Sequence, residues 1–368
     1  MKSVLFHYSV FNRGGAEKST LKLMKLFLKK GWKVKLVLNF RGGGMEEDIP
    51  AEVEVEYLSR FHIASYRNKF VRYILKSIDL LTNPFVFMKY KKECYDLACV
   101  GLQGLSPRFV CKIVDAKRRI TFIRNDISLC EKQEKIILGI KKYEKNLDQI
   151  ICVSKTAKES VDLLIPSCME KTKVVYNVLD VNEMKKQLEI SENPFRESIY
   201  LKVVSVCRMV DKAKGLFRML EAYERLYEKG IVFEWYFVGD GVDLPRMKKI
   251  VENKPYRKFI HFEGEKKNPF PYYKYADLVA VLSYYEGLCG IVNEAKVSGA
   301  AVIATEFSGI HEQLIHGKNG WIVENNLEGI VKGMEEILTN TLMREVIRNS
   351  TYPNAILNDD DKINQILG

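Results

Sequence analysis

The sequence has no apolar run of the ~18 residues that a membrane-spanning helix needs. Its longer apolar runs, such as residues 278–282, have the length of a strand. At the start of the chain, His7 and Asn12-Arg13 interrupt the apolar residues 3–6 before a signal-peptide core forms, and no small-residue cleavage site follows. We therefore expect a cytoplasmic protein that neither spans a membrane nor is secreted.

Paired cysteines and metal-ligand spacings are also absent from the sequence. The eight cysteines include no C-x-x-C pair and lie among apolar neighbours, which is typical of buried thiols in a reducing compartment. The five histidines have no ligand spacing. The acidic triplet at residues 359–361 lies in a polar tail, where a solvated charge run is the simpler interpretation. The sequence predicts no metal site and no cofactor.

The composition excludes further classes of protein. The 368 residues are 47% hydrophobic and 29% charged, which rules out collagen-like and intrinsically disordered chains and fits two medium-sized domains. Lys and Arg number 58 against 47 Asp and Glu, a net charge of +11. No recognised nucleic-acid-binding motif accompanies this charge, so we expect no nucleic acid partner.

The first half of the chain alternates strands with helices. Residues 3–6 and 32–38 have the pattern of strands, and between them a glycine turn precedes apolar residues at helical spacing. Such a β-α-β unit has a right-handed crossover and a parallel sheet. Further strands are expected at residues 96–100, 119–123 and 149–153. Residues 1–177 are therefore predicted to form an N-terminal Rossmann-like domain.

The pattern falters over residues 178–200, which we interpret as a linker, and then restarts. Strands are predicted at residues 201–206, 233–238, 260–262, 278–282, 301–304 and 321–323. Residues 201–350 are predicted to form a second Rossmann-like domain, and residues 351–368 a C-terminal tail that packs back on the first. The expected fold class is α/β, with two doubly wound domains facing an interdomain cleft.

The loop after the predicted strand 278–282 carries two carboxylates eight residues apart. Glu286 and Glu294 enclose Gly287 and Gly290 at the start of a predicted helix, where backbone N–H groups can bind an anion. This spacing suits a sugar diphosphate at one end and a ribose at the other. The alternative is that Glu286 is a surface loop acid and Glu294 a solvated helix residue.

A second candidate pair, Arg208 and Lys214, lies between the predicted strand 201–206 and the next helix. Two cations beside free backbone N–H groups suit a leaving diphosphate, because preorganised donors stabilise the charge that develops on its oxygen. The alternative is an ordinary pair of loop cations in a chain that has 58 of them.

Taken with other motifs, these residues resemble the nucleotide-sugar domain of the family 4 retaining glycosyltransferases, which have the GT-B fold. The C-terminal motifs of the resemblance are Arg208-x5-Lys214-Gly215, residues 237–241, 261–264 and 275–277, Glu286-Gly287 with Glu294, residues 305–312, and Gly317-x-x-Gly320. The N-terminal motifs are residues 14–17, 153–155 and 175–180. The resemblance covers nearly the whole chain, with its motifs in order.

The resemblance implies a role for each matching position. Arg208, Lys214 and Glu286 are expected to be catalytic, since the two cations would bind the donor diphosphate and Glu286 would hold hydroxyls of the donor sugar. Glu294 is expected to hydrogen-bond the ribose. The first domain is expected to bind the acceptor, and its glycines to approach the donor phosphate or the acceptor. The other donor-binding positions implied are Gly14, Gly15, Gly239, Gly287, Leu288, Cys289 and Gly290.

Arg124 departs from the family, whose members usually carry a histidine facing the donor sugar at this position. A guanidinium only donates hydrogen bonds and stays charged, so Arg124 cannot act as a base. Two partners are considered for the Arg124 guanidinium. One is an anionic group on the sugar or the acceptor, and the other is the neighbouring Asp126 in a structural pair.

The function that the resemblance implies is transfer of a hexose from a nucleotide diphosphate sugar, expected to be UDP-linked, to a glycan acceptor with retention of anomeric configuration. The acceptor is expected to be a lipid-linked or cell-surface polysaccharide precursor. The alternative is a non-catalytic nucleotide-sugar-binding scaffold or partner subunit, for which Arg124 is the one indication.

The segment 61–95 is basic and aromatic. Its seven basic residues, interleaved with aromatic ones, are Arg67, Lys69, Arg72, Lys76, Lys89, Lys91 and Lys92. A helix with such a face can lie on an anionic membrane surface, which predicts a peripheral position at the inner face of the membrane. The alternative is that the aromatic side chains belong to the core and the charges to a solvated face.

Overall fold

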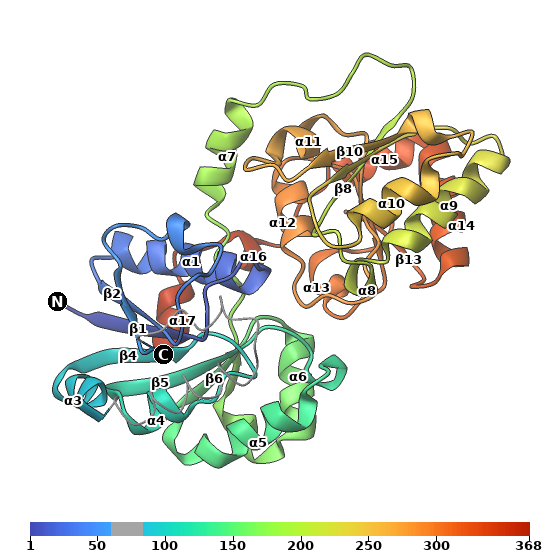
Figure 1. The fold of residues 1–368 in the computed structure, drawn as a ribbon. Helices are drawn as coiled ribbons and strands as arrows, with labels where there is room; N and C mark the ends of the chain where they lie inside the picture. Colours follow the sequence, from blue (N-terminus) through green and yellow to red (C-terminus); the bar gives the residue numbers. More distant parts are fainter. Residues whose placement is uncertain (60–83) are drawn as a thin grey trace. The chain divides into compact units, whose positions relative to one another are not determined.

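A computed structural model describes residues 1–59 and 84–368 of the chain (Figure 1). The chain divides into two compact units. Unit 1 consists of Met1–Val178 together with Asn358–Gly368, and unit 2 of Leu179–Leu357. Among the described residues, no helix has both the length and the apolar character needed to cross a membrane.

Unit 1 is built on a seven-stranded parallel sheet in the order β3-β2-β1-β4-β5-β6-β7. In register, Val4 of β1 pairs with Val34 on one side and Leu97 on the other. The strands are β1 Ser3–Tyr8, β2 Lys33–Leu38, β3 Glu54–Tyr57, β4 Cys94–Val100, β5 Asp115–Ile123, β6 Gln149–Cys152 and β7 Thr172–Val174. The α-helices are α1 Gly15–Lys29, α3 Pro84–Lys92, α4 Arg108–Lys112, α5 Gln133–Tyr143, α6 Lys155–Leu164 and α17 Lys362–Leu367.

The core of unit 1 follows from strand alternation, because successive side chains point to opposite faces of a sheet. Phe6 belongs to the cluster under α1, whereas Leu5 belongs to the cluster under α3 and α4. Ile363 and Ile366 of α17 join the α1 cluster. The last eleven residues of the chain thus belong to unit 1 and contribute these two side chains to its core.

Unit 2 has a six-stranded parallel sheet in the order β10-β9-β8-β11-β12-β13. Its strands are β8 Lys202–Val206, β9 Glu234–Val238, β10 Ile260–Gly264, β11 Leu278–Val281, β12 Val302–Thr305 and β13 Trp321–Val323. The α-helices are α7 Val181–Glu189, α8 Asp211–Lys214, α9 Leu216–Glu228, α10 Leu244–Val251, α11 Phe270–Tyr275, α12 Gly290–Val297, α13 Ile310–Gln313, α14 Leu327–Thr339, α15 Thr341–Arg348 and α16 Asn354–Leu357. Helices α9, α10 and α14 pack on one face of this sheet, and α11 and α12 on the other (Figure 1).

Two parallel α/β sheets with helices on both faces confirm the expected fold class. Each sequence-predicted strand is present, within a few residues of its expected bounds. Strands β3 and β7 were not predicted, because one is half acidic and the other has only three residues. The segment 178–200, expected as a linker, contains α7 and belongs to unit 2 from Leu179 onward. Residues 351–357 also lie in unit 2, whereas residues 358–368 lie in unit 1.

Candidate functional site

The carboxyl edge of the unit 2 sheet collects the predicted donor-binding residues. Arg208 follows β8 by two residues, Gly239 directly follows β9, and Glu286 lies in the loop after β11. The strands β9, β8 and β11 are neighbours in this parallel sheet, so their carboxyl ends lie side by side. This edge is where ligands bind in open α/β sheets.

Lys214 and Glu286 form an ion pair between α8 and the loop after β11. Both side chains are largely buried, and the Ser283 hydroxyl donates a second hydrogen bond to Glu286 Oε1 at 2.9 Å. Burial by itself would lower the pKa of Lys214, but the charge of Glu286, the hydrogen bond to it and the nearby Cys289 and Cys207 together raise the pKa. The lysine is therefore a fixed cation, held at the position where the sequence predicted a diphosphate contact.

The loop that carries Arg208 is shaped by a close backbone approach at Gly239. The residue has a φ of +143°, and a Cβ placed there would lie 1.9 Å from the carbonyl oxygen of Cys207. Only glycine fits this position. The Arg208 side chain is exposed, and within the described part of the chain its guanidinium makes no hydrogen bond or ion pair. It is thus available to a ligand beside the Lys214–Glu286 pair.

The loop before α12 is held by Gln313, a residue that the sequence patterns did not single out. Its Oε1 accepts from the Cys289 N–H at 2.9 Å, and its Nε2 donates to the Cys289 carbonyl at 2.8 Å. The Cys289 amide was expected to bind the donor, but the Gln313 side chain already occupies it. Burial raises the pKa of the Cys289 thiol to about 12, so it stays protonated and is no nucleophile.

The rest of this loop contains both buried and exposed positions. Gly287 and Leu288 are buried, whereas Gly290, the first residue of α12, is exposed. Glu294, one turn into the helix, accepts a hydrogen bond from the Tyr273 hydroxyl at 3.1 Å. The sequence missed Tyr273 and Ser283 because a buried tyrosine or serine gives no periodic or motif signal.

In unit 1, Gly14 and Gly15 lie at the N-terminus of α1, where Gly14 is the N-cap without any side-chain cap. This helix follows β1, so its N-terminus lies at the carboxyl edge of the sheet. The first turn therefore has its backbone N–H groups at this edge. The expected approach of Gly14 and Gly15 to the donor phosphate or the acceptor stays a prediction.

Arg124 is hydrogen-bonded inside unit 1 and does not pair with Asp126, while its expected contact with an anionic group on the sugar or the acceptor stays a prediction. It is 7% exposed, and its guanidinium donates to Asn177, Ser19, Thr20 and Gly101. The expected pair with Asp126 is wrong, because the Asp126 carboxylate instead accepts from the Ser128 N–H at 2.8 Å and caps a short 3-10 helix. The arginine is a buried crosslink between chain segments.

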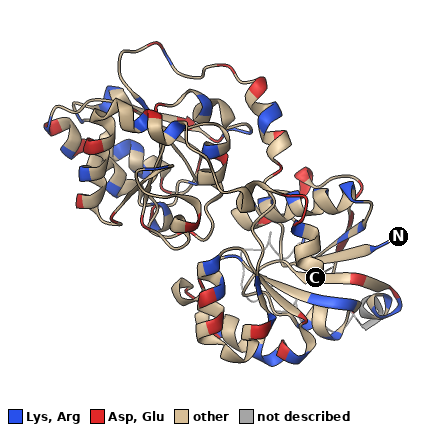
Figure 2. Cartoon of the chain, turned by 180° about the vertical axis from the view of Figure 1, so that it is seen from behind, with Lys and Arg blue, Asp and Glu red and all other residues tan. Residues whose placement is uncertain are grey.

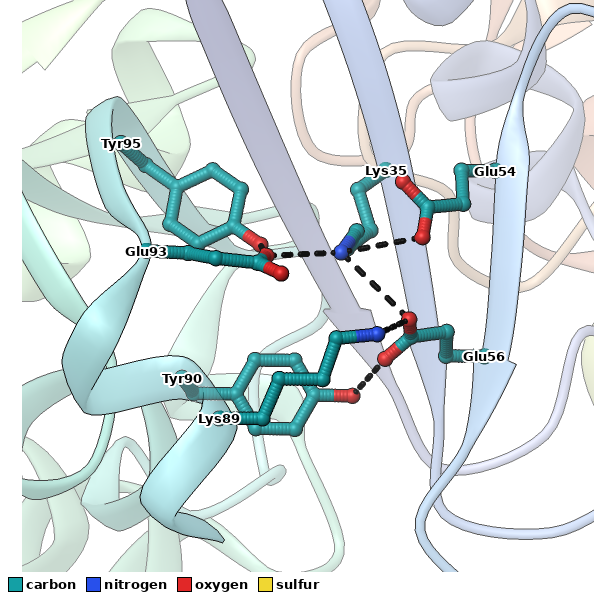
Figure 3. A network of polar contacts seen from close by, with 7 residues as sticks. All are labelled: Lys35, Glu54, Glu56, Lys89, Tyr90, Glu93 and Tyr95. Carbon is teal, nitrogen blue, oxygen red and sulfur yellow. Dashed lines mark hydrogen bonds and ion pairs between the residues drawn. The ribbon is translucent and has the colours of Figure 1, made fainter. Parts of the chain in front are cut away.

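The segment 61–95, which is predicted to dock on a membrane, lies mostly outside the described residues. Arg67, Lys69, Arg72 and Lys76 are among the residues outside. Lys89, in α3, is described and forms an ion pair with Glu56 of β3 (Figure 3). Burial would raise the pKa of Glu56, but hydrogen bonds from Lys89 and Tyr90 lower it to about 2. Elsewhere, basic and acidic residues are interspersed along the helices of both units (Figure 2).

Candidate metal ligands do not gather in the part of the chain that the structure describes. Within residues 1–59 and 84–368, no group of three or more His, Cys, Asp or Glu side chains could hold a metal ion.

Residues 186–353, which include the Arg208, Lys214, Glu286 and Glu294 positions, match the family model described as "Glycosyl transferases group 1". Over its whole length, the chain is similar to the crystal structure of Anabaena HepE in complex with UDP and glucose. The TM-score is 0.74 at 17% identity, and the match covers 100% of this chain and 99% of HepE.

Curated relatives are glycosyltransferases as well. The capsular polysaccharide biosynthesis glycosyltransferase CapH of Staphylococcus aureus is 24% identical over 317 residues, which cover 83% of this chain and 81% of CapH. Two uncharacterized glycosyltransferases of Methanocaldococcus jannaschii are 23% and 27% identical over 70% and 55% of this chain, and the chain spans only 64% and 54% of their lengths. Residues 186–353 thus match a glycosyltransferase family model, and the chain as a whole has the GT-B fold, with two parallel-sheet α/β units.

Proposed function

We propose that this protein transfers a hexose from a UDP-linked sugar to a glycan acceptor with retention of anomeric configuration. The observation that carries the proposal is the arrangement at the carboxyl edge of the unit 2 sheet, where the buried Lys214–Glu286 pair lies in the same strand-end region as the exposed Arg208. Retention rests on the resemblance to family 4. The choice of UDP is supported by HepE, whose structure holds UDP and glucose.

The chemistry follows from the charges at this edge. The bond from the anomeric carbon to the diphosphate oxygen breaks, and a bond from that carbon to an acceptor hydroxyl oxygen forms on the same face. The departing diphosphate gains negative charge, which Arg208 and Lys214 would stabilise as preorganised donors. The hydroxyl proton passes to the departing phosphate oxygen, so no side-chain base is required. Glu286, once its lysine contacts a phosphate, would accept hydrogen bonds from the sugar hydroxyls.

The acceptor is proposed to be a lipid-linked or cell-surface polysaccharide precursor. CapH, which acts in capsular polysaccharide biosynthesis, supports this class of acceptor. An acceptor of this kind would be met at a membrane surface, and the basic segment 61–95 would supply electrostatic attraction to anionic lipids.

The test is a screen of nucleotide sugars against the purified full chain. With a UDP-hexose, we expect slow release of UDP without an acceptor and faster release with a polyprenyl-linked glycan, and NMR of the product should show the anomeric configuration of the donor. Thermal stabilisation by UDP without any sugar release would indicate a nucleotide-sugar-binding scaffold instead. Absence of both stabilisation and release across the nucleotides would overturn the proposal.

A further inference from the structure

Arg124 is a buried arginine whose hydrogen-bond partners are all uncharged. Its guanidinium donates to Asn177 Oδ1 at 2.8 Å, Thr20 Oγ1 at 2.7 Å, Ser19 Oγ at 3.1 Å and the Gly101 carbonyl at 3.3 Å. Among the residues that the structure describes, it has no carboxylate partner. A buried charge without a counter-ion is costly unless it is fully hydrogen-bonded. Here the hydrogen bonds replace the counter-ion, and they fix the geometry of their acceptors.

The acceptors belong to three segments at one edge of the unit 1 sheet. Ser19 and Thr20 lie in the second turn of α1, Gly101 directly follows β4, and Asn177 follows β7. Because these strands are parallel, all three segments lie at their carboxyl ends, and Arg124 itself directly follows β5. One side chain therefore ties the segments that follow the neighbouring strands β1 and β4 to the segment after β7, which pairs with neither of them.

Tyr8 contacts two of the same acceptors, Thr20 and Gly101. Its hydroxyl lies 2.6 Å from Thr20 Oγ1 and donates to the Gly101 carbonyl at 2.8 Å. A Cβ on residue 101 would lie 1.8 Å from the Tyr8 ring, so only glycine permits this approach. Thr20 and Gly101 are thus held by two side chains each, which makes the cluster rigid.

Asn177 connects this cluster to the places where the chain passes between units. The first passage follows Val178 and the second precedes Asn358. Asn177 Oδ1 accepts from Arg124 and from Ser19, whose Oγ lies at 2.5 Å, while its backbone carbonyl accepts from Lys362 Nζ at 2.7 Å. Lys362 is 1% exposed and begins α17, just after the second passage.

We propose that Arg124 is a positioning residue, which holds the N-terminal part of α1 in a fixed relation to Asn177 beside the chain passage. Gly14 is the N-cap of that helix and Gly15 its first residue, so the crosslink sets where their backbone N–H groups lie. The inference deepens the proposed function and rests on it. Arg124 then acts on the transfer step through geometry, without contact with the donor, because reacting groups must be aligned to a fraction of an ångström.

The test compares Arg124→Gln with a matched control, Arg344→Gln. Arg344 is also a buried arginine with neutral partners, and it donates to the carbonyls of Ile337 and Leu338 at 2.7 Å within unit 2. At a temperature where both variants are folded, we expect kcat of the Arg124 variant to fall roughly 10- to 100-fold. Its Kd for UDP should change much less than kcat, since Arg208 and Lys214, the cations proposed to bind the diphosphate, lie in unit 2. The control should keep its kcat.

Two further measurements separate positioning from general destabilisation. Hydrogen exchange should speed up at residues 15–20 and 175–178 in the Arg124 variant but not in the control. Asn177→Ala should lower kcat as well, and the double variant should be no worse than the more severe single one, because both remove the same crosslink. If Arg124→Gln does not fold, kcat is measured for Thr20→Val and Asn177→Ala instead. Each of these substitutions removes one acceptor of the Arg124 guanidinium and should lower kcat.

The proposal is overturned by an unchanged kcat in the folded Arg124 variant, by an equal loss in the control, or by additive effects of the two substitutions. A loss of UDP affinity as large as the loss of kcat in Arg124→Gln would also overturn it, because it would show that the residue acts on donor binding and not on the transfer step. Failure of the proposed function is distinguishable: wild type would then show no transfer, while the exchange measurement would still report whether Arg124 holds α1.

Discussion

Lys214 and Glu286 form a largely buried ion pair although they lie 72 residues apart in the sequence. The pair joins the end of α8 to the loop after β11, and it places a cation and a carboxylate together at the edge where a donor would bind. In the proposed function the lysine contacts the diphosphate, and its carboxylate partner would keep it oriented. The following predictions begin with this pair.

Alanine at Lys214 or Arg208 should lower kcat by roughly 100-fold or more, because each substitution removes a cation aimed at charge that grows on the departing diphosphate. Lys254→Ala is the matched control, since Lys254 also pairs with a glutamate, Glu224, in unit 2 but is partly exposed. Steady-state kinetics with the donor in excess measures the effect. Wild-type turnover in either variant would show that the diphosphate contact is assigned to the wrong residues.

Chelators should leave the activity intact. Arg208 and Lys214 would already neutralise the diphosphate, so a divalent ion is not required for that task. The measurement is the initial rate after treatment with EDTA, with and without added Mg²⁺ or Mn²⁺. A complete loss in EDTA that either metal restores would contradict this expectation.

Replacing Arg67, Lys69, Arg72 and Lys76 with Gln should release the protein from anionic vesicles. Each Lys or Arg near such a surface contributes ~1 kcal/mol of attraction, which salt screens. Co-sedimentation with vesicles that contain or lack phosphatidylserine measures the fraction of protein bound. The Kd for UDP should be the same for the variant and the wild type. Vesicle binding that ignores both the substitutions and added salt would exclude an electrostatic attachment.

The free energy of unfolding should fall as the pH decreases from about 6.5 to about 4, in part because of His7. His7 is 2% exposed in β1, and burial lowers its pKa to about 4 although Asn39 hydrogen-bonds the ring. Between these pH values His7 binds a proton in the unfolded chain but not in the folded chain. His7 therefore does not reduce the free energy of unfolding above about pH 6.5, and reduces it progressively as the pH falls toward 4. The loss from this group is about 3 kcal/mol at most.

Urea unfolding of wild type and His7→Gln at several pH values between 4 and 7 measures this contribution. The variant should show a shallower dependence on pH, and the difference isolates His7 from the carboxylates that titrate in the same range. His311→Gln, at an exposed position, should keep the wild-type dependence. Identical pH profiles for wild type and His7→Gln would contradict the prediction.

Lys35→Met should lower the free energy of unfolding by about 3 kcal/mol, because it leaves carboxylates beside a buried position without their cation. Lys35 Nζ lies 3.1 Å from Glu54, 3.4 Å from Glu56 and 2.9 Å from Glu93 (Figure 3). The control is Lys117→Met, which removes an exposed ion pair with Asp96 and should lower the free energy of unfolding much less. Equal losses in urea unfolding would show that the buried network adds nothing.

Local patterns were sufficient for the fold class. The run at residues 33–38 alternates along a strand and follows a helix that ends near Gly31, so its place in a parallel sheet could be predicted from a dozen residues. The positions of Arg208, Gly239 and Glu286 after strands were predictable for the same reason, since parallel strands end at one edge. Strands β3 and β7 were missed because pairing with a neighbour, rather than their own composition, makes them strands.

The sequence by itself determined the two α/β domains and the edge where the charged motifs gather, because strand and helix periodicity and motif spacing are local properties. Only the tertiary structure decided that Lys214 faces Glu286, that Gln313 occupies the Cys289 amide, and that Arg124 contacts Asn177 instead of Asp126. These contacts depend on which distant segments the sheets bring together, and on burial, which makes a hydrogen-bond partner obligatory for each polar group.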